Sequence, residues 1–251
     1  SKGLLKHRES AYISLSSQLT QWREKGIIDP DTIIDQHRIL DKLLTYNSLN
    51  EFLDDAPSHY ILDTQENQPV YLETWAEKDT LHGIVADICH TYRIPLVISK
   101  GFTSYSFKHE ALKRFSEINK PVQMLYLGDW DAEGLYIPQL LQEFLARNGS
   151  EIKLDRVAMV ERDIKSLPSI AWHPSTLHLK KEYVSTYVKN YGKTKWEIEA
   201  LSFRDIRDRL LDSISKYVDI DKLKKTRRKE QKERELLAQR LQKFMRRSEI
   251  A

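Results

Sequence analysis

The stretch that decides the fold is LYLGDWDAEG, residues 125–134. Bulky apolar residues lead to Gly128, and two aspartates, Asp129 and Asp131, follow one residue apart. A short apolar run that ends at a turn residue is typical of a buried strand. Alternation along an extended segment puts Asp129 and Asp131 on the same side. The stretch therefore predicts a buried strand that carries two carboxylates at its carboxyl end.

The segments on either side of this stretch alternate between strand and helix patterns. We expect strands over residues 70–76, 95–99, 122–128 and 152–160, and helices over residues 77–92, 107–118 and 132–147. Asn148 and Gly149 follow the last of these helices and are typical of a helix C terminus. Such alternation is typical of βαβ units. The sequence therefore predicts an α/β fold, a parallel sheet flanked by helices.

Helical patterns precede the first strand. Residues 11–26 carry apolar side chains at helical spacing, and the pattern stops at Gly26. Within residues 27–44 the pattern restarts after Pro30, and a second helix is expected there with Asp31 as a plausible N-cap. Residues 53–70 contain two prolines and predict a connector.

The region after the fourth strand is less regular. We read residues 161–177 as a loop, residues 194–201 (TKWEIEAL) as a short strand and residues 203–218 as an amphipathic helix. One more helix is expected beyond Asp221, with a narrow apolar stripe of Leu236, Leu237, Leu241 and Phe244. The predicted plan is an N-terminal helical segment (1–69), a sheet domain (70–165), its C-terminal extension (166–221) and a basic helical tail (222–251).

The composition is that of an ordinary globular chain. Of 251 residues, 31% are charged and 40% hydrophobic, and the net charge is +3. No apolar run approaches the roughly 18–20 residues that span a bilayer, and the first residues lack the pattern of a signal peptide. The single cysteine, Cys89, excludes a disulfide framework and a Cys-rich zinc site. We therefore expect a cytoplasmic protein without membrane contact.

Three acidic residues are expected where parallel α/β sheets bind ligands, beyond the carboxyl ends of the strands. Glu77 follows the first strand, and Asp129 and Asp131 follow the third. Glu73 competes with Glu77, but it lies inside its strand. Two carboxylates about 4 Å apart repel by roughly 4 kcal/mol at an effective dielectric constant of 20. Such a cluster requires protons, a basic partner or a divalent cation, and its oxygen ligands favour Mg²⁺ or Mn²⁺ over zinc.

The alternative is a purely structural role, in which the two aspartates only form a polar loop that caps the next helix. Gly128 and Gly134 bracket the pair, and glycines at these positions predict room for a bulky ligand. Together with Glu77 at the matching end of an earlier strand, they favour the metal site over the alternative.

The ordered set of motifs resembles a Toprim domain, the metal-binding catalytic domain of topoisomerases, primases and OLD-type nucleases. That family places a glutamate after its first strand, a glycine after its second and Asp-x-Asp after its third. The matching residues here are Glu77, Gly101, Asp129 and Asp131.

A closer likeness is to the topoisomerase VI A subunit and the related meiotic double-strand-break proteins. Their Glu-Lys, Lys-Gly and Asp-x-Asp-Pro-x-Gly motifs are similar to residues 77–78, 100–101 and 129–134, with Ala132 where the family has proline. The likeness is strongest to short stand-alone A-like proteins of phages and mobile elements. In those, segments similar to residues 27–38 and 195–201 flank the Toprim part, so the resemblance covers roughly residues 10–220.

The resemblance implies Mg²⁺-dependent (or Mn²⁺-dependent) cleavage of phosphodiester bonds in nucleic acid, DNA rather than RNA. It implies that the catalytic and metal-binding residues are Glu77, Asp129 and Asp131. Either Glu77 and Asp129 hold one ion and Asp131 with Asp129 holds a second, weaker one, or Glu77 acts instead as a general base in one-metal chemistry. Three residues at the same sheet edge are expected to contact nucleic-acid phosphates: Lys78, Lys100 and Ser104. Glu133, Glu197 and Glu199 are weaker candidates for the site.

Two features of the family have no counterpart in the matched region. The A subunits carry a winged-helix domain with a DNA-attacking tyrosine before the Toprim part, whereas Tyr12, Tyr46 and Tyr60 lie in no matching motif. We therefore expect a nuclease that uses water, or a fragment of a DNA-cleaving subunit. The partners implied are nucleic acid, a second copy of the chain and an ATPase subunit.

Two other functions compete with cleavage. One is a non-catalytic DNA-binding or assembly subunit on the same scaffold. The other, a haloacid dehalogenase-type phosphatase, ranks lower because its Asp-x-Asp follows the first strand of the domain.

The basic tail has two interpretations of its own. It could grip nucleic acid through phosphate contacts. It could instead be a solvated helix or a coiled-coil arm of a dimer, and the interspersed Glu230, Glu233 and Glu235 favour that second interpretation.

Overall fold

The computed structural model describes residues 9–29, 32, 43–100, 104–173 and 179–248. The chain divides into two compact units, Ser1–Thr45 and Tyr46–Ala251. In the first unit, the helix expected over residues 11–26 is found as α1 (Glu9–Glu24), and Gly26 follows it with a positive φ of 68°. Most of the second expected helix, residues 27–44, lies outside the described residues.

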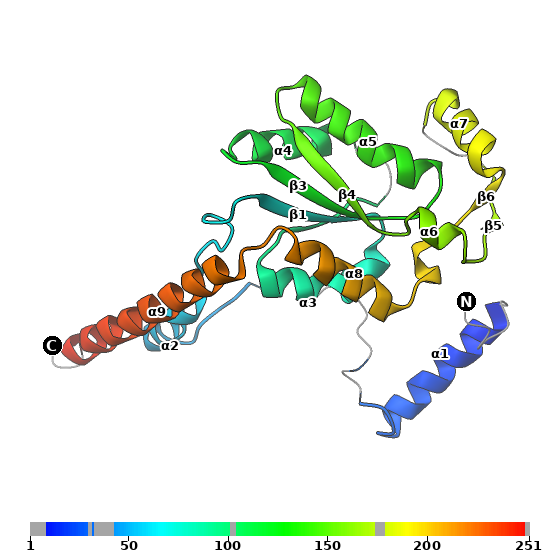
Figure 1. The fold of residues 1–251 in the computed structure, drawn as a ribbon. Helices are drawn as coiled ribbons and strands as arrows, with labels where there is room; N and C mark the ends of the chain where they lie inside the picture. The colour runs from blue at the N-terminus through cyan, green and yellow to red at the C-terminus, as the bar shows by residue number, and fades with distance from the viewer. Residues whose placement is uncertain (1–8, 30–31, 33–42, 101–103, 174–178, 249–251) are drawn as a thin grey trace. The chain divides into compact units, whose positions relative to one another are not determined.

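The second unit is built on a parallel sheet of four strands, as predicted. The strands are β1 (Tyr71–Ala76), β2 (Leu96–Ile98), β3 (Val122–Leu127) and β4 (Ile152–Ala158), in the order β2-β1-β3-β4. All three neighbouring pairs are parallel (Figure 1). All six residues of β3 are buried, which is why this strand reads as a continuous apolar run.

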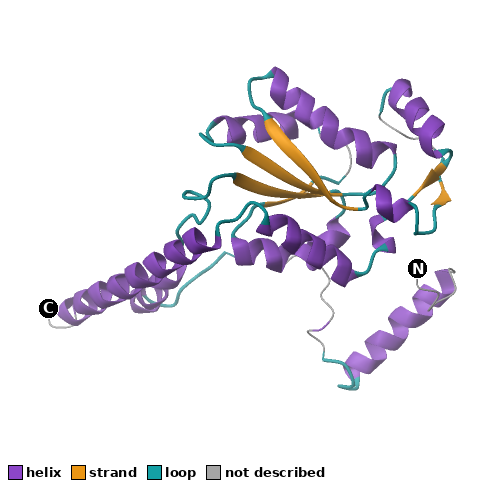
Figure 2. Ribbon diagram, viewed as in Figure 1, coloured by secondary structure: helices purple, strands orange, loops and turns teal. Residues whose placement is uncertain are grey.

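Helices cover both faces of this sheet (Figure 2). One layer contains α4 (Tyr105–Ser116) and α5 (Ala132–Arg147), and the other contains α3 (His82–Tyr92) and α8 (Phe203–Ser215). Side chains of β3 alternate between the layers. Met124 packs in a core cluster with Phe115 of α4, whereas Leu125 packs in a cluster with Ile206 of α8.

The connections change direction between the two central strands. The chain leaves β1 toward α3 on one face and leaves β3 toward α5 on the opposite face (Figure 1). Because β1 and β3 are neighbours, their carboxyl ends form a topological switch point, the place where open α/β sheets bind ligands.

Three segments differ from the sequence prediction. The expected connector begins inside helical structure, because Ser48 caps α2 (Leu49–Asp55) and the turn η2 (Ala56–His59) continues it around Pro57. The expected loop over residues 161–177 contains α6 (Glu161–Ile164) and β5 (Ile170–Ala171), which pairs antiparallel with β6 (Thr194–Lys195). A further helix, α7 (Lys181–Tyr191), was not predicted, because Tyr187 is its single buried residue.

The tail forms the predicted helix, α9 (Ile220–Ser248), but its buried side is different. Leu236 and Phe244 of the expected apolar stripe are 47% and 56% exposed. The helix is instead anchored in its first half by Leu223, Thr226 and Glu230, which are spaced three and four residues apart and are buried. Among the described helices, none combines the length and apolar character that crossing a membrane requires.

Candidate acidic site at the ends of strands β1 and β3

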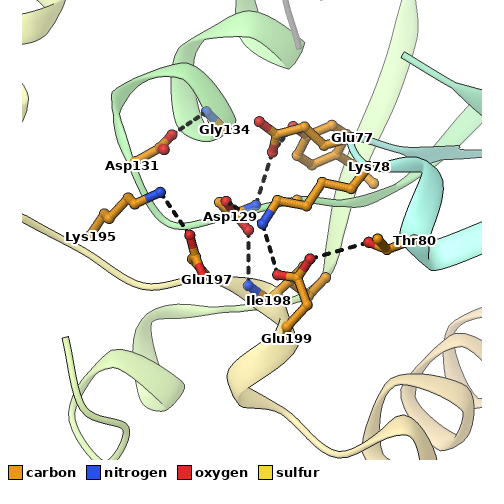
Figure 3. A network of polar contacts seen from close by, with 12 residues as sticks. Glu77, Lys78, Thr80, Asp129, Asp131, Gly134, Lys195, Glu197, Ile198 and Glu199 are labelled. Atoms are coloured by element: carbon orange, nitrogen blue, oxygen red, sulfur yellow. Dashed lines mark hydrogen bonds and ion pairs between the residues drawn. The ribbon is translucent and has the colours of Figure 1, made fainter. Parts of the chain in front are cut away.

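Glu77 and Asp129 meet because β1 and β3 are paired in register. Ala76 lies opposite Leu127, and the Glu77 N–H donates to the Leu127 carbonyl at 2.9 Å. Just beyond the ends of the two strands, Oε2 of Glu77 accepts a hydrogen bond from the Asp129 N–H at 2.9 Å (Figure 3). The same oxygen accepts from the Tyr126 hydroxyl at 3.2 Å. Two of the predicted site residues therefore form one hydrogen-bonded unit.

Asp129 is 3% exposed, and each of its carboxylate oxygens has a partner. Oδ1 accepts from the Ile198 N–H at 2.9 Å, and Oδ2 lies 2.9 Å from Nζ of Lys78. Lys78 was predicted to contact nucleic-acid phosphate. In the structure its ammonium group is a counter-ion inside the acidic site.

Asp131 is 7% exposed and caps α5, because its Oδ1 accepts from the Gly134 N–H at 2.8 Å. The bland interpretation of this aspartate as a helix cap is therefore correct for one of its oxygens. Capping does not remove it from the acidic site, because its charge still acts on Glu77.

Two of the carboxyl groups, those of Glu77 and Asp129, have raised pKa values. Burial raises the pKa of Glu77 to about 7, and the nearby charges of Asp129 and Asp131 add to that rise. Burial also raises the pKa of Asp129, against the opposing effects of Lys78 and the Ile198 N–H. Burial is the largest cause of both shifts, so the site favours the protonated form of Glu77 more than water does.

Residues 194–201, expected only as a short strand, close the site from the other side (Figure 3). Trp130 and Trp196 exchange backbone hydrogen bonds of 2.8 and 3.1 Å, which bring this segment against the Asp129 loop. The Lys78 ammonium group also lies 2.8 Å from Oε2 of Glu199, and Lys195 pairs with Glu197 at 2.8 Å.

The two lysines of this network are held in their charged form. Burial opposes the charge on Lys78, but its hydrogen bonds and its attraction to Glu199 and Asp129 raise its pKa. Burial likewise opposes the charge on Lys195, and Glu197 raises the pKa of that residue. The weaker candidates Glu197 and Glu199 are therefore part of the site's charge network.

Arg156 of β4 supports the loop that carries both aspartates, a role that sequence reasoning missed. Its guanidinium donates to the carbonyls of Gly128 (2.9 Å), Asp129 (3.0 Å), Met159 (3.1 Å) and Gly134. It also lies 5.2 and 5.4 Å from the ring centroids of Tyr126 and Trp130. Burial lowers the pKa of Arg156. The available signal was an arginine within an otherwise apolar strand end, RVAMV (156–160).

The two glycines that bracket the pair have a different purpose from the one predicted. A Cβ on Gly128 would lie 2.5 Å from both Oε2 of Glu77 and the Tyr126 hydroxyl. A Cβ on Gly134 would lie 2.2 Å from the carbonyl oxygen of Asp129. Protein atoms, rather than a ligand, therefore fill the space that these glycines leave.

The remaining predicted residues have other partners. The exposed Lys100 lies 3.4 Å from Oδ2 of Asp79, and Ser104 caps α4 by accepting from the Phe107 N–H at 3.2 Å. Glu73 is a strand-face residue, as expected: it is fully buried and paired with Arg114 at 2.8 Å. Gly101 lies outside the described residues.

The donor set suits a hard cation, but its present arrangement is closed. In the described part of the chain, no three acidic, histidine or cysteine side chains are arranged to hold a metal ion. Backbone amides occupy one oxygen of Asp129 and one of Asp131, and Lys78 occupies the other oxygen of Asp129. A divalent cation bound by Asp129 would therefore compete with the Lys78 ammonium group for its carboxylate.

Comparisons of the chain with protein-family models, curated proteins and solved structures found no match. Function therefore has to be inferred from the chemistry of the site itself.

Proposed function

We propose that this chain is a Mg²⁺- or Mn²⁺-dependent nuclease with a Toprim-like site, acting on its own or as the DNA-cleaving subunit of a topoisomerase VI-like assembly. The observation that carries the proposal is the convergence of three buried carboxylates, Glu77, Asp129 and Asp131, at the topological switch point. Their order along the chain is the order that the Toprim resemblance implies. A second copy of the chain or an ATPase subunit belongs to the assembly version of this proposal.

The chain's own residues suit such chemistry. Glu77, Asp129 and Asp131 would hold the metal, which when bound neutralises phosphate charge and activates water. Glu77, with a pKa near 7, has the proton affinity of a general base at neutral pH. Lys78, once released from Asp129, would remain next to Glu199 and would place a positive charge beside the bound phosphate.

The test combines metal titration with cleavage. Calorimetric titration of Mg²⁺ and Mn²⁺ into the wild type and Asp129→Asn is paired with a plasmid-nicking assay on the same samples. The matched control is Glu143→Gln, an exposed acidic residue on α5. We expect metal binding and nicking in the wild type and in the control, and the loss of both in Asp129→Asn.

A non-catalytic assembly subunit is the second candidate. It is favoured by one observation, the direct pairing of Lys78 with Asp129, which leaves the site neutralised without a metal. Under this alternative the wild type binds no metal up to millimolar concentrations. That result would overturn the nuclease proposal.

A further inference from the structure

The first half of α9 carries a dense positive charge. Residues 222–234 contain five lysines, three arginines and two glutamates. From the sequence, the glutamates favour a solvated or self-associating helix, because they interrupt the basic run.

The structure turns both glutamates toward the body of the second unit. Glu230 is 4% exposed, and its carboxylate accepts from Arg93 at 2.5 and 2.8 Å and from the Leu62 N–H at 2.8 Å. Oε2 of Glu233 accepts from the Tyr60 hydroxyl at 2.7 Å. Both acidic groups hold the helix in place. Glu230 is buried and adds little negative charge to the outer side of the helix, whereas Glu233 is partly exposed and lies beside Lys229.

The rotation of α9 about its own axis is fixed by further contacts. Leu223 and Thr226 are buried on the same side as Glu230. Arg234 donates to the Tyr60 carbonyl at 2.7 Å, and Arg227 donates to the Thr91 carbonyl. These contacts therefore fix which side of α9 faces the body of the second unit and which side faces away from it.

A groove of about 830 Å³ lies along α9, next to its packed side, and Asn67, Thr226 and Glu233 form part of its lining. The rest of the lining is basic and comes from Lys222, Lys225, Arg228, Lys229 and Lys232, here called the α9 basic stripe. All five are exposed. Two of them form loose ion pairs, with 3.9 Å between Lys222 and Asp219 and between Lys229 and Glu233. Exposed ion pairs of this kind contribute little and are readily exchanged.

We infer that the α9 basic stripe binds the phosphate backbone of duplex nucleic acid. The stripe spans eleven residues, from Lys222 to Lys232, or roughly 15 Å along the helix. A duplex presents a phosphate charge about every 1.7 Å of its axis. No aromatic residue lines the groove within the described chain, so a stacking platform for single strands is absent there. This inference does not depend on the metal site, since phosphate contacts of lysine and arginine need no metal.

The test measures binding without cleavage. The full chain is titrated into a fluorescently labelled 20-base-pair duplex in EDTA, and anisotropy is followed at several salt concentrations between 50 and 200 mM. The variant is Lys225→Gln/Arg228→Gln/Lys232→Gln. Each phosphate contact contributes about −0.9 to the slope of log affinity against log salt. We therefore expect the variant to bind about tenfold or more weakly at the lowest salt, with a slope smaller by roughly 2 to 3.

The control removes the same charge elsewhere. Lys113, Lys153 and Lys189 are exposed on α4, β4 and α7, and their triple glutamine variant should keep wild-type affinity and slope. Circular dichroism melting shows that each variant is folded. Equal losses of duplex affinity in both variants would mean that only the net charge matters. A stripe variant with wild-type affinity would mean that the stripe does not contact the duplex. Either result overturns the inference.

Two further outcomes would also overturn it. If a single strand of the same length binds more tightly than the duplex, the assignment of duplex nucleic acid as the ligand is wrong. If the stripe variant differs from the wild type only in oligomeric state, measured by sedimentation, the stripe contacts a second copy of the chain. Asp129→Asn should bind the duplex normally in EDTA. A wild type that binds the duplex but nicks no plasmid in the presence of metal would overturn the nuclease proposal alone.

Discussion

Nζ of Lys78 lies 2.9 Å from Oδ2 of Asp129, so the protein supplies a cation of its own to the acidic site. From the sequence, the two residues have separate predicted roles: Lys78 contacts nucleic-acid phosphate, and Asp129 binds the metal. Their pairing means that metal binding and lysine placement are competing events at one carboxylate oxygen.

Replacing Lys78 by methionine should strengthen metal binding. Without the ammonium group, Asp129 loses a competitor for the metal, and we expect Mg²⁺ affinity to rise about tenfold, equivalent to ~1.4 kcal/mol. The same variant should melt at a lower temperature than the wild type in EDTA, because a buried carboxylate then lacks its partner. Calorimetry and thermal melting measure the two effects. Lys100→Met is the matched control, and equal or weaker metal binding by Lys78→Met would contradict the competition.

Stability should fall as pH rises from about 4.5 to about 7. The pKa of Glu77 is raised from 4.5 to about 7 in the folded protein, so in this window the folded state binds more protons than the unfolded state. The free energy of unfolding therefore decreases with increasing pH across the window and levels off above it. Urea unfolding in EDTA at several pH values should show this decline in the wild type and in Glu143→Gln. In Glu77→Gln the decrease in the free energy of unfolding should be smaller by roughly 1–3 kcal/mol. If the decrease is unchanged in this variant, other titrating groups cause it.

Arg156→Gln should be among the most destabilising substitutions of a buried residue in the protein. The guanidinium serves carbonyls of Gly128, Asp129, Met159 and Gly134 at once, and hydrogen bonds to charged groups contribute about 1.5–3 kcal/mol each. We expect a loss of at least about 3 kcal/mol in urea unfolding, and Arg156→Lys should recover only part of it because lysine lacks the fork. Arg162→Gln, at an exposed position, should change stability by less than about 0.5 kcal/mol.

Alanine at Gly128 should disturb the acidic site through packing. Its Cβ would lie 2.5 Å from Oε2 of Glu77, so the carboxylate has to move, at a cost of about 1–3 kcal/mol. Gly149→Ala is the comparison, because Gly149 has a positive φ of 83° but open space around it, and it should cost about 1 kcal/mol through backbone strain alone. Metal titration separates the two, since only Gly128→Ala should weaken binding. Equal effects on binding would mean that the close approach is unimportant.

The sequence was most informative where local pattern decides structure. The buried run of β3 and the Asp131 cap of α5 could both be read from residues 122–134, and Glu77 was placed by the end of β1. Contacts between distant segments could not be read in this way. Nothing local to Arg156 says which carbonyls it will meet, because those carbonyls belong to a loop that a different strand positions.

The tail illustrates the same limit. Its helix was predicted from composition and length, but its buried side was assigned to Leu236 and Phe244. The partner that decides the matter, Arg93, follows α3 and lies 137 residues away in sequence from Glu230. An ion pair at such a separation leaves no periodic signal in either segment.

The hydrogen bond from the Ile198 N–H to Asp129 joins residues 69 positions apart. Contacts of this span close late during folding, because the intervening chain has to be ordered first. During synthesis, the sheet strands and both aspartates leave the ribosome well before residue 198 does. We therefore expect nascent chains to pass through a stage in which the sheet can form while the acidic site still lacks one wall. Any activity of this site would then begin only after residue 198 has left the ribosome.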